Sequence, residues 1–504
     1  MGPSDTDRFR EFVQKLQQED ERVAALNDIK NLLTFKPAGE SAQVIRNVGI
    51  TKILQCVNLP EKSQVDLTCE VLRLCFEKLA AGDAVKNYTS HIMYLLRHEK
   101  ECVRKLAIDE VYKTVVSTPD ALPVPQYVDV FVAVAHLVAD ENVGISNKAV
   151  LITSNLPAPA YPKILDEMKI ALDLGSSSKC NAYEVVTNIS AKSPELLALS
   201  YEHGYIEHML TELSSNDVLY QLNILELLSR LAIKPHGINF LVEQRALDKI
   251  AENIVGIKDN AFAPLLLPGY MKFFGCIAHL YPQEIFQKYP VLLNTLWETF
   301  NSGDLNLLPV ALDTLGFIGT TIEGKLSLAA TGCKFTQTVQ KTGELMRAST
   351  TDLKIRALHC MSNLIGYDKD PTARNGPIDH RVTLMTREWF RSLSTTPEST
   401  QMLHEICKNP FPEISEAAYT LLDAVTQHRW GEELVARTPG FIEYLLDRST
   451  GQSKEIKEVK FGIIRRLSVS AAFEPSVVEK LTAYVQKGPF YSEHSLEVAM
   501  EEGE

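Results

Sequence analysis

The sequence predicts an all-α protein, an armadillo/HEAT-like α-solenoid with a superhelical repeat of about 42 residues. Three observations predict this fold: a local pattern that recurs at nearly constant spacing, apolar helices separated by helix breakers, and no strand-like alternation with hairpin turns. The chain has 504 residues, which is too long for one compact globule. Stacked repeats accommodate that length, because each one buries its apolar face against its neighbours.

The recurring pattern has a small or polar residue, an aliphatic residue four positions later, and a Gly or another small or helix-breaking residue at position nine. The ninth positions are Gly49, Ser90, Gly204, Ala246, Pro290, Gly332 and Gly440. Their adjacent spacings are 41, 42, 44 and 42 residues. The gap of 114 residues between positions 90 and 204 fits three short units, and the gap of 108 between 332 and 440 fits two units with an insertion.

A longer helix closes each unit, and we call it the third helix. Each one starts from an Ala or Ile anchor and carries a leucine-type residue seven positions later. The clearest examples are Ala149–Leu156, Ala182–Ile189, Ile224–Leu231, Ala311–Ile318 and Ala357–Leu364. The apolar stretch 264–325 lies in the middle of this series, and we expect its Phe273 and Phe274 to be core residues.

The repeats predict one continuous solenoid over residues 1–491. A polar stretch with Pro and Gly, at about residues 366–380, is predicted to be an inserted loop. The acidic tail 492–504 has few large apolar residues, so we predict that it is disordered.

Composition and motifs exclude several classes of protein. The net charge of −13 argues against nucleic-acid binding, which needs a basic face. No apolar run approaches the roughly 18 residues of a membrane span, and the N-terminus lacks the apolar core of a signal peptide. We therefore expect a cytoplasmic protein that could also enter the nucleus.

Catalytic motifs are missing as well. The sequence has no GxxxxGK[ST], HExxH or GxSxG, and His404 with Cys407 offers a metal only two ligands. The sequence therefore predicts no enzyme, no cofactor and no metal.

A partner-binding surface is left as the candidate site. In an armadillo-type solenoid the third helices line the concave face, and the residues two and six positions after each anchor share one stripe. The predicted partner-binding residues are Asp109, Asn155, Glu184, Asn188, Glu226, Arg230, Asp313, His359 and Asn363. The four carboxylates among them could form an acidic row for a basic partner, or they could be ordinary exposed helix positions.

The residues of this stripe argue against one kind of partner, a basic peptide that serves as a nuclear import signal. Armadillo proteins of the importin-α type pair each groove asparagine with a tryptophan one turn earlier, which clamps basic peptides. Here the residues four positions before the three asparagines are Leu151, Glu184 and His359. Recognition of import signals therefore loses its main support.

Several segments, in order and suitably spaced, carry a family resemblance. They are Leu267–Gly275, Ala311–Gly319 with Glu323–Lys325, Leu353–Arg356, Met385–Phe390, Asn409–Glu413, Pro439–Tyr444 with Asp447–Ser449, and Gly488–Tyr491. Together they resemble the non-ATPase regulatory subunit 5 family of the 26S proteasome, firmly over about residues 240–491 and more loosely before that.

The resemblance implies a non-catalytic chaperone for assembly of the base of the proteasome regulatory particle. Its members bind the C-terminal AAA domain of a base ATPase subunit, within an intermediate that also holds a second ATPase and the large non-ATPase scaffold subunit. They leave before the mature 26S proteasome forms. We expect a monomer when the chain is free, with no nucleic-acid or membrane partner. The alternative is an armadillo-type adaptor that binds a linear peptide or a signalling partner.

Overall fold

The computed structural model describes residues 4–117, 123–215, 217–256, 262–367, 380–451 and 453–491. Its internal contacts divide the chain into two units, Met1–Phe240 and Leu241–Glu504. The described residues form helices and turns, with no β-strand among them. One continuous solenoid over residues 1–491 stays a prediction. Most of the predicted loop and the whole tail 492–504 lie outside the described residues.

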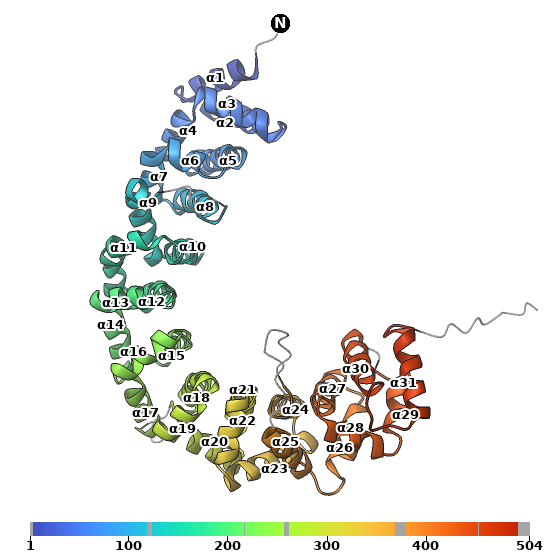
Figure 1. The fold of residues 1–504 in the computed structure, drawn as a ribbon. Coiled ribbons are helices and arrows are strands. Elements are labelled where there is room, and N and C mark those ends of the chain that lie inside the picture. The colour runs from blue at the N-terminus through green and yellow to red at the C-terminus, as the bar shows by residue number, and fades with distance from the viewer. Residues whose placement is uncertain are drawn as a thin grey trace, which may run out of the picture. The chain divides into compact units, whose positions relative to one another are not determined.

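The third helices form a consecutive series within each unit (Figure 1). In unit 1 they are α2 (Arg22–Thr34), α5 (Lys62–Lys78), α8 (Glu101–Ser117), α10 (Val143–Ser154), α12 (Ser176–Ser190) and α15 (Val218–Ala232). In unit 2 they are α18 (Ala263–Leu280), α21 (Leu308–Ile318), α24 (Thr351–Ile365), α27 (Pro412–Thr426) and α30 (Lys454–Leu467). Within each unit, each third helix packs against the next one in the series.

The remaining α-helices lie before, between and after the third helices in the chain. Up to the unit boundary they are α1 (Asp5–Lys15), α3 (Ala38–Val48), α4 (Thr51–Gln55), α6 (Asp83–Asn87), α7 (Thr89–Leu96), α9 (Val124–His136), α11 (Tyr161–Met168), α13 (Pro194–Glu202), α14 (Tyr205–Thr211) and α16 (Pro235–Glu243). Beyond it they are α17 (Ala246–Gly256), α19 (Pro282–Lys288), α20 (Val291–Ser302), α22 (Ile322–Ala330), α23 (Cys333–Arg347), α25 (His380–Ser392), α26 (Ser399–Cys407), α28 (Arg429–Arg437), α29 (Phe441–Leu446) and α31 (Pro475–Lys487).

The backbone confirms the predicted repeat register. The four glycines at ninth positions, Gly49, Gly204, Gly332 and Gly440, all have φ between 71° and 83°. At the Ala246 copy the positive φ falls one residue earlier, on Arg245. Glycine adopts such angles at little cost, which explains why it recurs where the chain turns into the second helix of a unit.

The anchors and the apolar middle are buried as the pattern predicts. Ala149, Ala182, Ile224, Ala311 and Ala357 have no solvent exposure. Phe273 and Phe274 on α18 are also fully buried, and their rings meet edge to face with centroids 5.3 Å apart. Each third helix therefore uses its anchor side for the core, which leaves the stripe two and six positions later to face outward.

A close backbone approach joins the end of a third helix to the next repeat. At Gly431 on α28, an added Cβ would lie 2.0 Å from the carbonyl oxygen of Val425 on α27. The same contact recurs at Gly324 on α22, where the distance to the carbonyl oxygen of Ile318 would be 1.9 Å. Only glycine fits this junction, because real Cβ atoms essentially never approach within 3.0 Å of another heavy atom.

Basic side chains from a later repeat cap the carbonyl ends of the third helices in unit 1. The donor and acceptor residues are Lys113 and Phe76, Lys192 and Ser154, and His236 and Ser190, with distances of 2.5–2.8 Å. Lys78 likewise donates to the carbonyl of Lys36, just beyond the end of α2, at 3.0 Å. The last carbonyls of a helix have no partner within it and carry partial negative charge. These contacts satisfy some of those carbonyls and fix the spacing of neighbouring repeats.

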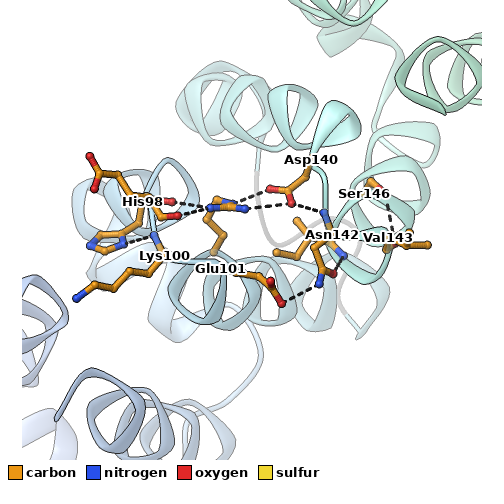
Figure 2. Close-up of polar contacts among 10 residues, drawn as sticks. His98, Lys100, Glu101, Asp140, Asn142, Val143 and Ser146 are labelled. Carbon is orange, nitrogen blue, oxygen red and sulfur yellow. Dashed lines mark hydrogen bonds and ion pairs between the residues drawn. The ribbon is translucent and has the colours of Figure 1, made fainter. Parts of the chain in front are cut away.

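An ion pair joins the repeats of α8 and α10 near the N-terminal ends of these two helices (Figure 2). The guanidinium of Arg104 contacts both carboxylate oxygens of Asp140, at 2.6 and 3.1 Å. It also donates to the carbonyls of His98 and Glu99, at 3.0 and 2.8 Å. The other hydrogen bond to Asp140 comes from the backbone N–H of Asn142, at 2.9 Å. The Asp140 side chain is 4% exposed and that of Arg104 19%, so this pair is largely shielded from solvent.

Candidate partner-binding surface

The predicted stripe of unit 1 lies on the outward side of its third helices. Asp109 belongs to α8, Asn155 caps the C-terminus of α10, and the other members lie on α12 and α15. Asn155 and Glu226 are exposed, whereas Asp109, Glu184, Asn188 and Arg230 are half-buried. That these residues bind a partner stays a prediction.

Two of the three carboxylates in this stripe are paired with a basic residue of the next third helix. Asp109 forms an ion pair with Lys148 of α10. Glu184 contacts Arg230 of α15 at 3.4 Å. Glu226 has no ion pair among the described residues. The stripe of unit 1 therefore combines two ion pairs with one carboxylate, Glu226, that has no basic partner among the described residues.

The two asparagines of the stripe also make contacts within the chain. Asn155 donates a side-chain hydrogen bond to the carbonyl of Leu151, at 2.9 Å. Asn188 donates to the hydroxyl of Ser154 on the preceding third helix, at 3.2 Å. Asn188 therefore helps to hold α12 against α10, in addition to any role in binding.

In unit 2 the stripe begins at Asp313 on α21, which is exposed and paired with Arg356 of α24. Arg356 also contacts Asp352 at 3.0 Å. Neighbouring atoms partly desolvate the Asp313 carboxyl and raise its pKa, while Arg356 acts in the opposite direction. For an imidazole, desolvation has the opposite effect: it lowers the pKa of His359, which lies one turn from Asn363. The Asp313 carboxylate acts to raise the pKa of His359. The three predicted residues of this unit therefore share one polar surface on two adjacent helices.

A cleft of about 510 Å³ opens where α21, α24 and α27 end. Asn363 lines it together with Phe317, which lies at the equivalent position on α21. The ring of Phe317 is 41% exposed and stacks on His279, with centroids 4.0 Å apart. The stripe thus leads into a hollow with an aromatic wall and an amide on its rim. A cleft of this size can accept one or two side chains of a partner.

The sequence interpretation missed the basic partners of the carboxylates. Lys148 and Arg356 each stand one residue before an anchor, Ala149 and Ala357, in the unit that follows the carboxylate. The residue one position before each anchor is therefore a third position of interest, beside those two and six positions after it. Its pairing depends on the stacking of units, which the local pattern does not describe.

The described residues hold no group of three or more His, Cys, Asp or Glu side chains arranged to bind a metal ion. Among the helices that the structure describes, none has the length and apolar character needed to cross a membrane.

Two solved structures of similar fold contain the yeast protein Kap95p, which is named as importin-β. The yeast importin-β (Kap95p) structure aligns with 96% of this chain and 66% of its own, with a TM-score of 0.55 and 12% identity. The Kap95:Nup1 complex aligns with 95% of this chain and 59% of its own, with a TM-score of 0.59 and 13% identity. At such low identity the likeness shows the fold alone, and it confirms a HEAT-like α-solenoid.

Curated relatives match almost the whole chain. The 26S proteasome non-ATPase regulatory subunit 5 of Bos taurus is 27% identical over 478 residues, which cover 92% of this chain and 93% of the relative. The protein of the same name from Homo sapiens is 26% identical and covers 95% of both chains. The family described as "Proteasome non-ATPase 26S subunit" matches residues 6–504. The chain therefore belongs to the proteasome non-ATPase 26S subunit family.

Proposed function

We propose that this protein is a non-catalytic chaperone for assembly of the base of the proteasome regulatory particle. It binds the C-terminal AAA domain of a base ATPase subunit and leaves before the mature 26S proteasome forms. The observation that carries this proposal is the family match over residues 6–504, with relatives named as non-ATPase regulatory subunits. The large non-ATPase scaffold subunit and a second ATPase complete the proposed intermediate.

The charges of the predicted stripe support a folded partner. Pairs such as Asp109 with Lys148 and Glu184 with Arg230 present both signs side by side. A folded domain also carries both signs on its surface, so complementary patches can fix its orientation. A uniformly basic peptide would meet Lys148 and Arg230 as well as the carboxylates, which weakens the case for an adaptor of linear basic peptides.

The first experiment tests where the protein is found. The tagged full-length chain is expected to co-purify with base ATPase subunits and the scaffold subunit, and to be absent from purified, intact 26S particles. Mass spectrometry of both samples decides the question. A stoichiometric amount of the protein in mature particles would contradict a chaperone that is released. Capture of flexible peptides without any ATPase subunit would instead favour the adaptor.

A second experiment asks whether the stripe makes the contact. Glu184→Arg combined with Arg230→Glu keeps the internal ion pair but reverses its direction, so folding should be preserved. Glu226→Lys changes a carboxylate that has no ion pair in the described residues. Glu202→Lys, on the exposed end of α13, is the matched control of equal charge change. We expect the first two variants, but not the control, to weaken ATPase-subunit binding in a salt-dependent way. Unchanged binding by both would place the partner elsewhere.

A further inference from the structure

A second hollow lies away from the predicted stripe, between α22, α23 and α25 of unit 2. Its volume is about 650 Å³. Figure 1 shows α23 and α25 on the other side of this unit from α21 and α24. The floor contains Phe335 and Trp389, which are 1% and 7% exposed and whose ring centroids are 5.0 Å apart. Leu384 stands at the rim and is 49% exposed. The hollow therefore offers apolar contact area that no side chain of the described protein fills.

Two arginines give this hollow its charge. Arg387 and Arg391 both line it, and they lie one turn apart on α25. Neither forms an ion pair with any residue that the structure describes. The Nε atom of Arg387 is buried and has no hydrogen-bond partner. A buried donor without a partner is costly, so a ligand that supplies an acceptor there gains affinity. Glu388 is the one carboxylate of the lining, which leaves the hollow with an excess of positive charge.

The chemistry of the hollow defines its occupant. A guanidinium offers parallel N–H groups that match the two oxygens of a carboxylate, and apolar walls favour an aliphatic or aromatic side chain. The volume suits one or two amino-acid side chains. The chain's net charge of −13 disfavours a negatively charged membrane or nucleic acid, because each would be repelled by the rest of the protein. A short peptide reaches the local positive charge without meeting that repulsion over a wide area.

We propose that the hollow between α22, α23 and α25 is a docking site for a partner's peptide segment that presents an apolar side chain next to a carboxylate. The carboxylate is held by Arg387 and Arg391, and the apolar side chain contacts Leu384 and Trp389. This site is separate from the stripe on the third helices, and it does not depend on the proposed chaperone function. It gives the protein a second point of attachment for a binding partner.

Fluorescence polarisation with a synthetic probe tests this proposal. The probe is fluorescein-SGEELF with a free C-terminal carboxylate. The comparison peptides are SGQQLF with an amidated terminus, which lacks the charges, and SGEEAA, which lacks the apolar side chains. The full-length protein is expected to bind the probe and to bind both comparison peptides more weakly. Failure to bind the probe, or equal binding of the uncharged peptide, would overturn the proposal.

Variants locate the contact. We expect Arg387→Gln with Arg391→Gln to weaken probe binding by roughly tenfold or more, because two charge-assisted hydrogen bonds are lost. Glu388→Gln removes the opposing charge and should tighten binding, and Leu384→Asp should weaken it.

The control for these variants removes two charges elsewhere. Lys341→Gln with Lys454→Gln changes residues that pair only with a glutamate one turn away, so binding should not change. Melting temperatures show whether each variant is folded. Equal probe binding by the double arginine variant and the wild type would refute the site. Loss of phosphatidylserine-vesicle binding in that variant, without any peptide binding, would assign the arginines to a membrane surface and refute the peptide proposal.

Discussion

Replacing Gly431 by alanine is the most direct test of how the repeats join. The added Cβ would lie 2.0 Å from the carbonyl oxygen of Val425, so the junction of α27 and α28 must open until the distance is at least 3.0 Å. That movement acts on His428, whose backbone carbonyl accepts from the N–H of Gly431 at 2.9 Å. It also strains the hydrogen bond from His428 Nε2 to the carbonyl of Ile365, at 2.8 Å.

The expected net effect is a loss of about 2 kcal/mol in the free energy of unfolding. Overpacking a tight junction typically costs about 1–3 kcal/mol, and weakening one buried hydrogen bond adds about 1 kcal/mol. Alanine recovers about 1 kcal/mol through its higher helix propensity. Gly462 on α30 is the matched control, because it is exposed and no heavy atom lies within 4 Å of its added Cβ. Gly462→Ala should therefore stabilise the protein by about 1 kcal/mol.

Urea unfolding followed by tryptophan fluorescence measures both variants. Trp430 stacks on His428 with ring centroids 5.0 Å apart, so it reports on the altered junction directly. We expect the unfolding midpoint to fall for Gly431→Ala and to rise for Gly462→Ala. If Gly431→Ala were as stable as the wild type, the close approach would not constrain this turn. The explanation given for glycine at Gly431 and Gly324 would then fail.

Three further changes test buried charges, each by urea unfolding followed by circular dichroism. Asp140→Ala leaves the guanidinium of Arg104 without its carboxylate and should cost about 3 kcal/mol, whereas a loss below about 1 kcal/mol would show that the pair is dispensable. Burial raises the pKa of Glu110 to about 7, so the native state keeps a proton that the unfolded chain has released, and stability should fall from pH 4.5 to 7. Glu110→Gln should remove that decline, and an unchanged pH profile would contradict it. Burial lowers the pKa of Lys325 to about 7, so between pH 7 and 10 the unfolded chain binds one more proton and stability should rise with pH. Lys325→Met should abolish this rise, and parallel profiles for variant and wild type would disprove the assignment.

The features that the sequence predicted correctly are local in origin. Gly204 and Gly440 mark turns because glycine tolerates the positive φ there, and this requirement does not depend on distant residues. The buried anchors, such as Ala182 and Ala357, follow from the spacing of apolar residues within one helix. The repeat period and the order of helices could therefore be predicted without a structure.

The parts that could not be predicted depend on residues far apart in the chain. Asp109 meets Lys148 only because α8 and α10 pack side by side, so the position of this ion pair could not be predicted from one helix. The arginine-lined hollow needs α25 to pack against α22 and α23, which come earlier in the chain. No pattern within α25 alone indicates which helices it packs against, so the sequence could not show that Arg387 and Arg391 line a hollow.

The caps on the third helices of unit 1 have a consequence for synthesis of the chain. Each carbonyl at Lys36, Phe76, Ser154 and Ser190 receives its hydrogen bond from a residue that is translated later. While the chain grows on a ribosome, the newest repeat lacks the side chain that completes its helix end. A nascent chain of this protein should therefore fold one repeat behind the point to which it has emerged, with the exposed end moving forward as each new lysine or histidine arrives.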